Sequence, residues 1–335
     1  MNSVAPTPHT TRTTAVVLIL LTLLSWAAVP LFLRHFTKDL HFDPISQNGW
    51  RYAISAGFWL PFLFFTWKRG NLPRPLFGLA IVPAIFNLFG QTFFTFGPAL
   101  LEPGMFSFVF RSQIVFVTLG AYLLFPAERS TLSSPRYWTG MVMVVVGSVG
   151  LVMVKDKGEG AHAAVTFLGV AVAFLSGLFF AGYGLSVRYY VNKYSPITSF
   201  GVICQYTAVG AISFALLAPL APGILPASLP PPDPTFPLAN FSLWSWLLLI
   251  ASAFIGIAIS HVMYYASLSR LGVAVSIGII QLQPIFTAVG SFLLFGERLN
   301  AWQWACGMLG VVGAMLMLKG GPKKNSRALA ESEAE

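Results

Sequence analysis

The chain has little charge and almost no cysteine. Asp, Glu, Lys and Arg make up 9% of its 335 residues, and the mean hydropathy is +0.73. A soluble domain carries roughly 25% charged residues, so this composition excludes an ordinary water-soluble protein. The two cysteines, Cys204 and Cys306, offer neither a metal-ligand spacing nor a disulfide pair, and we interpret them as packing residues. We predict neither a metal nor a cofactor.

Apolar residues occupy ten long stretches. Backbone groups that face lipid must be hydrogen-bonded within their own segment, and the stretches lack the alternation of a membrane β-barrel. We therefore predict an all-α integral membrane protein with ten transmembrane helices, each of about 20 residues. The predicted spans are 14–33, 47–66, 76–97, 104–125, 138–154, 165–187, 197–219, 243–268, 272–295 and 301–318.

The net charge of +9 has a topological explanation. If the N-terminus is cytoplasmic, the inner loops and tails hold 13 of the 20 Lys and Arg residues and the outer loops hold 5, while Arg51 and Arg111 fall within spans. Membrane proteins concentrate basic residues on their inner loops, so this bias favours cytoplasmic N- and C-termini. The charge then requires no nucleic acid as a partner; the expected surroundings are membrane lipid.

The spans lack acidic residues. Each of the eleven acids lies in a loop, at a helix end or in a tail. With no carboxylate at depth to carry a proton or bind Na⁺, we predict facilitated diffusion or exchange. His261 is the one group within the spans that could titrate near neutral pH, so an exporter of other amino acids, drugs or nucleosides with proton coupling through His261 stays an alternative. A passive channel is a second alternative.

An internal repeat relates the two halves of the chain. Residues 126–129 align with residues 295–298 at an offset of 169, and residues 44–49 align with residues 196–201 at an offset of 152. Five spans per copy is an odd number, so the copies cross the membrane in opposite directions, as in secondary transporters. The predicted segments are a tail at 1–13, a first repeat at 14–154, a linker at 155–164, a second repeat at 165–318 and a disordered tail at 319–335.

The end of each repeat carries a recognisable pattern. Pro284 and Glu297, followed by Gly307, Gly310 and Gly313, resemble the EamA family of the drug/metabolite transporter superfamily, and Glu128 keeps the acidic position in the first copy. Val115 replaces the proline there, so we expect a kink in the ninth span alone. The chain as a whole resembles the aromatic amino acid exporters of the YddG type in that family. The resemblance implies a multi-pass exporter of the cell inner membrane with a central cavity.

Two arginines lie within the spans. Arg111 is seven residues into the fourth span, ~10 Å deep at 1.5 Å per residue. It either accepts a substrate carboxylate or hydrogen-bonds helix carbonyls and locks a contact within the bundle; the sequence favours neither. Arg51 is about four residues from the outer end of the second span, so we expect its side chain to snorkel to the interface.

Polar and aromatic residues mark a candidate cavity wall. Asn87, Gln91 and Phe94 share one face of the third span. Trp26 and Tyr183 lie in equivalent spans and are suited to stacking against an aromatic substrate. The predicted substrate-binding residues are Trp26, Asn87, Gln91, Phe94, Arg111, Tyr183, His261, Tyr265 and Gln283, and the predicted structural residues are Glu128, Pro284 and Glu297.

The spans lack the side-chain pairs that an intramembrane active site needs. They contain no histidine pair and no carboxylate pair, so we predict a transporter of small molecules and not an enzyme. We expect the protein to act as a monomer or weak dimer.

Small residues allow two helix backbones to touch. Such contacts are predicted between the fifth and tenth spans at Gly140, Gly147, Gly150, Gly307, Gly310 and Gly313.

Overall fold

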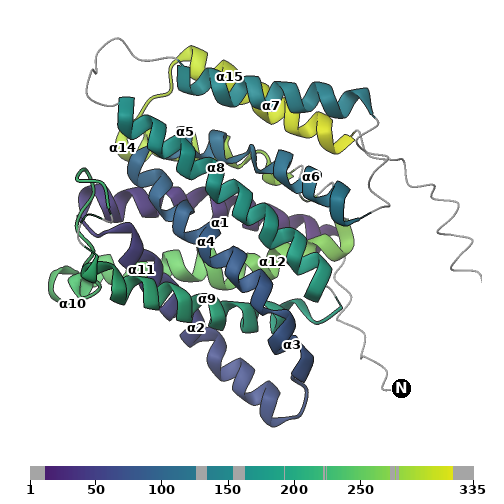
Figure 1. The fold of residues 1–335 in the computed structure, drawn as a ribbon, viewed down its shortest axis with the longest axis vertical. Coiled ribbons are helices and arrows are strands. Elements are labelled where there is room, and N and C mark those ends of the chain that lie inside the picture. The colour runs from purple at the N-terminus through teal and green to yellow at the C-terminus, as the bar shows by residue number, and fades with distance from the viewer. Residues whose placement is uncertain are drawn as a thin grey trace, which may run out of the picture.

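The computed structural model is a bundle of helices (Figure 1). It describes residues 12–125, 134–153 and 163–319, apart from residues 192, 222, 224, 272–275, 277 and 278. Within these ranges the regular elements are all helical and there is no β-strand, which confirms the all-α prediction.

The helices follow the apolar stretches of the sequence. The first half contains α1 (Arg12–Arg34), α2 (Pro44–Lys68), α3 (Arg74–Leu79), α4 (Ile81–Leu100), α5 (Pro103–Phe110), α6 (Gln113–Leu124) and α7 (Pro135–Met153). The second half contains α8 (Ala163–Ser186), α9 (Pro196–Leu217), α10 (Phe236–Asn240), α11 (Leu243–Ala253), α12 (Ser260–Leu271), α14 (Gln283–Phe295) and α15 (Ala301–Lys319). Each predicted span overlaps at least one of these helices.

Several helices continue into turns of a different pitch. The π-helical turn η1 (His35–Asp39) extends α1, and the π-helical turn η3 (Val187–Val191) extends α8. A third π-helical stretch, η5 (Phe254–Ile259), joins α11 to α12, and the 3₁₀ turn η4 (Ala218–Leu220) follows α9. Because α1 and α8 occupy equivalent positions in the repeat, η1 and η3 give both halves the same irregular end.

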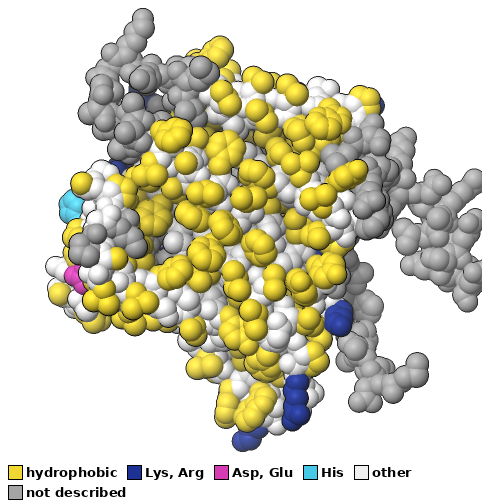
Figure 2. All heavy atoms as spheres, in the orientation of Figure 1, with side chains coloured by type: hydrophobic (Ala, Val, Ile, Leu, Met, Phe, Trp, Pro, Cys, Tyr) yellow, Lys and Arg dark blue, Asp and Glu magenta, His cyan; other side chains and the backbone are white. Residues whose placement is uncertain are grey.

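The outer surface is suited to lipid. Large apolar side chains such as Leu123, Phe167 and Leu293 are exposed. Figure 2 shows hydrophobic side chains across the visible face, with charged side chains at its margins. Six helical stretches of the described chain are long and apolar enough to cross a membrane: Thr13–Asp39, Arg74–Leu100, Pro103–Leu124, Phe167–Val191, Pro196–Leu220 and Leu243–Ser267. The number ten for the crossings stays a prediction.

Helices from the two halves pack in symmetric pairs. The contact of α4 with α8 and the contact of α1 with α12 become one another when each helix is exchanged for its equivalent in the other repeat. The pairs α2 with α9 and α7 with α15 join helices to their own equivalents, and the contact of α5 with α14 joins the equivalent fourth and ninth spans. Two similar halves related by a two-fold axis give this pattern of contacts.

The helices α7 and α15 run side by side at one edge of the bundle (Figure 1). A Cβ atom added to Gly147 would lie 2.5 Å from the carbonyl oxygen of Cys306, and one added to Gly313 would lie 2.6 Å from the carbonyl oxygen of Gly140. The two backbones therefore touch, in agreement with the prediction for these glycines. Gly307 differs, because it faces the ring of Phe108 on α5.

Both halves contain a helix break, and the expectation of a kink in the ninth span alone is wrong. The helix α5 ends at Phe110 and α6 begins at Gln113, two residues before Val115. At this break Ser112 N donates to Val109 O at 3.0 Å, so the chain turns through tighter i to i+3 bonds and needs no proline. In the second half, a turn precedes α14 and Pro284 lies in the first turn of that helix.

Candidate functional site

The two helix breaks meet at Arg111. Its Nη2 donates to Gln283 Oε1 at 2.6 Å, and its Nη1 donates to the carbonyl oxygen of Ile280 at 3.4 Å. The side chain is buried, and its guanidinium lies 4.9 Å from the centre of the Phe110 ring. Ile280 aligns with Arg111 at the repeat offset of 169. Arg111 therefore joins equivalent positions of the two halves.

Gln283 extends this contact to a third helix. Its Nε2 donates to the carbonyl oxygen of Trp26 at 2.9 Å, and Thr287, one turn along α14, donates to the carbonyl oxygen of Ala27 at 3.0 Å. One amide thus connects Arg111 with α1. The bundle contact considered for Arg111 is present in this conformation, and a carboxylate would have to replace Gln283 Oε1 to reach the guanidinium.

An aromatic cluster lies beside the hydrogen-bonded chain formed by Arg111, Gln283 and the carbonyl oxygen of Trp26. The ring of Trp26 on α1 is 5.5 Å from the ring of His261 and 5.1 Å from the ring of Tyr264, both on α12. The hydroxyl groups of Tyr183 on α8 and Tyr265 on α12 are 2.8 Å apart. The structure therefore brings together five of the nine predicted binding residues, Trp26, Tyr183, His261, Tyr265 and Gln283, and Arg111 joins them through Gln283.

His261 is held firmly within this cluster. Its ring stacks on Phe200 with centroids 4.7 Å apart and planes 10° apart, and its Nδ1 lies 3.0 Å from the carbonyl oxygen of Ile257. The side chain is buried. In this conformation His261 is a packed residue with a fixed ring orientation, as expected for a residue that shapes the wall of a site.

Asn87, Gln91 and Phe94 all lie on α4. Asn87 Nδ2 donates to the hydroxyl oxygen of Tyr52 at 2.9 Å and to Thr207 Oγ1 at 3.1 Å, so it joins α4 to α2 and α9. Gln91 is buried on the same helix. Phe94 packs among other phenylalanines between α4, α5 and α8, namely Phe106, Phe110 and Phe180. Asn87 and Phe94 thus hold the helices around the cluster.

Arg51 is fully buried, so the prediction that it snorkels to the interface is wrong. Its Nη2 donates to the carbonyl oxygen of Ser252 at 3.5 Å. The reason is a cover over the start of α2: Trp50 Nε1 donates to the carbonyl oxygen of Pro234 at 2.8 Å, and Asp233 N donates to Asp43 Oδ2 at 3.0 Å. The segment before α10 therefore closes the route that Arg51 would take to the interface.

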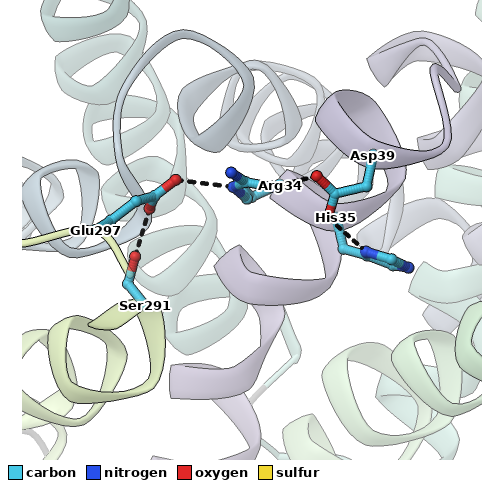
Figure 3. A network of polar contacts seen from close by, with 5 residues as sticks. All are labelled: Arg34, His35, Asp39, Ser291 and Glu297. Atoms are coloured by element: carbon cyan, nitrogen blue, oxygen red, sulfur yellow. Dashed lines mark hydrogen bonds and ion pairs between the residues drawn. The ribbon is translucent and has the colours of Figure 1, made fainter. Parts of the chain in front are cut away.

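An ion-pair network closes the end of the bundle where α1 and α14 finish (Figure 3). Arg34 Nε lies 2.8 Å from Glu297 Oε1, and Arg34 also pairs with Asp39. His35 Nδ1 lies 2.8 Å from Asp39 Oδ2, and Ser291 Oγ donates to Glu297 Oε2. Glu297, predicted as structural, thus ties α14 to the end of α1. Its predicted counterpart Glu128 lies outside the described residues.

A hollow of about 370 Å³ opens between α4, α6 and α8. Its wall is almost entirely apolar and includes Phe86, Phe116, Leu178 and Leu185. It contains none of the predicted binding residues. In the part of the chain that the structure describes, no group of three His, Cys, Asp or Glu side chains is placed to hold a metal ion.

The fold and its lipid-facing surface define a multi-pass helical membrane protein. The model of the EamA-like transporter family matches the chain twice, over residues 13–153 and residues 167–319. The chain belongs to the EamA-like transporter family. It is therefore a transporter of small molecules, and transport rather than catalysis is the activity of the class.

The chain is also similar to two further proteins. A protein of Haemophilus influenzae (strain ATCC 51907 / DSM 11121 / KW20 / Rd), described as an uncharacterized transporter, is 22% identical over 295 residues, which cover 84% of this chain and 90% of that protein. A protein known from a crystal structure superposes with a TM-score of 0.58 at 16% identity, covering 97% of this chain and 100% of the other. This second likeness extends to the fold alone.

Proposed function

We propose that this transporter exports aromatic amino acids and related aromatic compounds by alternating access. The observation that carries the proposal is the continuity of the Trp26, His261, Tyr183 and Tyr265 cluster with Arg111 through Gln283. An aromatic side chain has ring faces and edges to pack against in this cluster. A carboxylate has one guanidinium within reach, once Gln283 moves aside.

The membrane arrangement that we propose has ten crossings. The four predicted spans beyond the six long apolar stretches coincide with α2, α7, α14 and α15. Both termini are cytoplasmic in this arrangement, in the cell inner membrane, because of the distribution of Lys and Arg. The repeats extend over residues 14–154 and 165–318, with the linker and tails as predicted from the sequence, and the protein acts as a monomer or weak dimer.

Closure at the two ends of the bundle supports alternating access. At one end, the Arg34 guanidinium lies 4.1 Å from the centre of the Phe295 ring, beside Glu297. At the equivalent end of the other repeat, the Arg188 guanidinium lies 4.1 Å from the centre of the Phe125 ring. Each arginine thus contacts a phenylalanine at the end of a helix of the other half. We call these two contacts the Arg34 latch and the Arg188 latch. Alternating access requires similar closing contacts on the two sides of the membrane, and the two latches meet this requirement.

In the proposed topology, with the N-terminus in the cytoplasm, the Arg34 latch lies on the extracytoplasmic side. Its ion pair joins α1 of the first repeat to the end of α14 of the second, so separating the repeats at that end must break it. Substrate then enters the cluster from the cytoplasm and leaves when the Arg34 latch opens. With no acid at membrane depth in the sequence, the substrate gradient or an exchanged solute drives the cycle.

Counterflow in proteoliposomes tests the proposal. Vesicles loaded with unlabelled phenylalanine are expected to accumulate labelled phenylalanine transiently, with saturation and without a pH gradient. Leucine and uridine serve as non-aromatic and nucleoside comparisons. Accumulation of leucine or uridine without accumulation of phenylalanine would refute the proposed aromatic substrate. Dependence on a pH gradient would favour proton coupling through His261. Unsaturable flux without counterflow would favour a channel.

The variant Arg111→Gln separates recognition from packing. It keeps hydrogen-bond donors for Ile280 but removes the charge that a carboxylate needs, so we expect the half-saturating phenylalanine concentration to rise about tenfold or more. Arg136→Gln is the matched control, because Arg136 is exposed at the start of α7. Equal behaviour of the two variants would remove Arg111 from the substrate site.

A further inference from the structure

Arg51 is a buried cation that the transport scheme above leaves unused. Its side chain is 0% exposed, and its one hydrogen bond of 3.5 Å to the carbonyl oxygen of Ser252 is at the limit of such bonds. Its Nε and Nη1 have no hydrogen-bond partner among the described residues. All eleven acids of the sequence lie outside the predicted spans, so no fixed carboxylate is expected at its depth.

Such a charge is expensive to bury without a counter-ion. The penalty for moving an isolated ion into a protein interior is several kcal/mol, and a single weak carbonyl contact does not offset it. Arg111 differs, since it has a bond of 2.6 Å to Gln283 in addition to its carbonyl contact. Arg51 has the features of a group whose partner arrives from outside the chain.

The guanidinium of Arg51 packs closely against the backbone at Gly256. A Cβ atom added to Gly256 would lie 2.9 Å from Arg51 Nη2 and 2.7 Å from Val29 Cγ2, so the guanidinium rests against bare backbone of η5 next to α1. Nearby on α2, the Oδ1 atom of Asn48 is also buried without a partner among the described residues. Nothing larger than glycine fits at position 256 while Arg51 stays in place.

Both arginines lie close to helices of the aromatic cluster. Arg111 reaches the carbonyl oxygen of Trp26 on α1 through Gln283. The guanidinium of Arg51 lies beside Gly256 of η5, next to Val29 of α1, and η5 leads into α12, which carries His261. A small molecule whose ring packs in the cluster therefore has two cations on neighbouring helices, and the sequence of the spans contains no acid.

We propose that Arg51 forms a second anion-binding site, beside η5 and separate from Arg111. Its ligand is a carboxylate of the transported compound or a chloride ion that accompanies it; both offer a single compact negative charge to the free Nε and Nη1 donors. For a carboxylate ligand the site rests on the proposed function, and the two arginines then select aromatic compounds of negative net charge over cationic ones.

Three probes that differ only in charge test this selection. Phenylalanine is a zwitterion, 3-phenylpropanoate lacks its ammonium group, and 2-phenylethylamine lacks its carboxylate. Competition against phenylalanine counterflow is expected to be strong with 3-phenylpropanoate and weak with 2-phenylethylamine in the wild-type protein. In Arg51→Gln the preference for 3-phenylpropanoate is expected to fall about 10-fold or more, as for the loss of a charged hydrogen bond.

Chloride replacement distinguishes the two sources of the anion. If the ligand is chloride, replacing chloride by gluconate on both sides slows wild-type counterflow, and Arg51→Gln no longer responds to this exchange. If the ligand is the carboxylate, the exchange has no effect and only the charge preference changes. Arg51→Lys keeps the charge but not the forked donors, and it replaces Arg51→Gln in these tests if that variant does not fold. Arg51→Lys is expected still to prefer 3-phenylpropanoate to 2-phenylethylamine, with weaker competition by 3-phenylpropanoate than in the wild-type protein.

The outcomes separate this site from the proposed function. If Arg51→Gln, or Arg51→Lys in its place, keeps wild-type preferences among the three probes and the wild-type response to chloride, Arg51 is a structural residue and the second site is overturned. Absence of phenylalanine counterflow in the wild-type protein overturns the proposed function instead. In that case a chloride-dependent rise in the melting temperature of the wild-type protein, lost in the variant, still supports the site, and a chloride-independent melting temperature overturns it.

Discussion

The ion pair between Arg34 and Glu297 provides a direct test of alternating access. The substitution Glu297→Gln keeps the shape of the side chain and an oxygen that accepts from Arg34, but removes the charge. If this pair holds the extracytoplasmic end closed, the variant shifts the equilibrium toward the conformation open on that side. The substitution Arg298→Gln is the matched control, because the Arg298 guanidinium lies over Phe292 of its own segment and does not reach α1.

The size of the shift follows from the burial of the pair. A hydrogen bond to a charged group contributes about 1.5–3 kcal/mol, a neutral one about 0.5–1.5 kcal/mol, and an exposed ion pair about 0.2–1 kcal/mol. The Arg34 and Glu297 side chains are each 18% exposed, which is between the buried and exposed limits. We expect a loss of about 1 kcal/mol, and therefore about a fivefold rise in the ratio of open to closed protein.

Cysteine labelling measures this ratio. A cysteine at position 287, in a background with Cys204 and Cys306 replaced, lies one turn from Ser291 and is buried in the closed state. A membrane-impermeant thiol reagent added from the extracytoplasmic side is expected to react about five times faster in Glu297→Gln, because reaction follows the open population. Reagent added from the cytoplasmic side is expected to react more slowly or equally.

Three results would refute the reasoning. An unchanged rate in Glu297→Gln would mean that the pair does not control access. An equal rise in Arg298→Gln would assign the effect to net charge at that end of the bundle. A rise from both sides of the membrane would indicate general loosening of the helices and not a shift between two states.

The remaining predictions concern packing and capping, and thermal unfolding in detergent measures each of them. Gly147→Ala is expected to destabilise by about 1–3 kcal/mol through overpacking against α15, whereas Gly184→Ala, with no atom within 4 Å of an added Cβ, is expected to be neutral or stabilising. Burial raises the pKa of the Asp43 carboxyl, so its contribution to stability grows as pH falls through that raised pKa. Asp43→Asn keeps the cap acceptor but loses the acceptor for Asp233 N, so it is expected to lose less stability than Asp43→Ala, which loses about 1 kcal/mol or more. Tyr265→Phe leaves the Tyr183 hydroxyl without this partner and is expected to lose about 1 kcal/mol.

Much of the fold follows from local sequence patterns. Long apolar stretches predict helices because a backbone in lipid must satisfy its own hydrogen bonds. Glycines on the fifth and tenth spans predict the contact of α7 with α15, because only small residues let two backbones touch. Gln283 and Thr287 are four residues apart, which places them on one helical face, and both donate to carbonyl oxygens of α1.

The errors come from contacts between residues far apart in the chain. The depth of Arg51 in its own helix suggested an interfacial side chain, but the segment around Pro234 covers that helix end and is 184 residues from Trp50. The break at Arg111 has no proline that would predict it, because local i to i+3 bonds turn the chain there. The side chain of Arg111 then bonds Ile280 and Gln283 of the other half. Spacing along one helix contains no information on either contact.

The two hypotheses for Arg111 lead to one further measurement. A carboxylate that displaces Gln283 from Arg111 frees the amide whose Nε2 also donates to the carbonyl oxygen of Trp26, so substrate binding weakens the contact between α14 and α1. These are the two helices whose far ends the Arg34 and Glu297 pair holds together. Saturating phenylalanine is therefore expected to accelerate extracytoplasmic labelling at position 287 in the wild-type background and to have no effect in Arg111→Gln. Acceleration of equal size in both proteins would mean that the carboxylate binds elsewhere and that Arg111 serves the bundle alone.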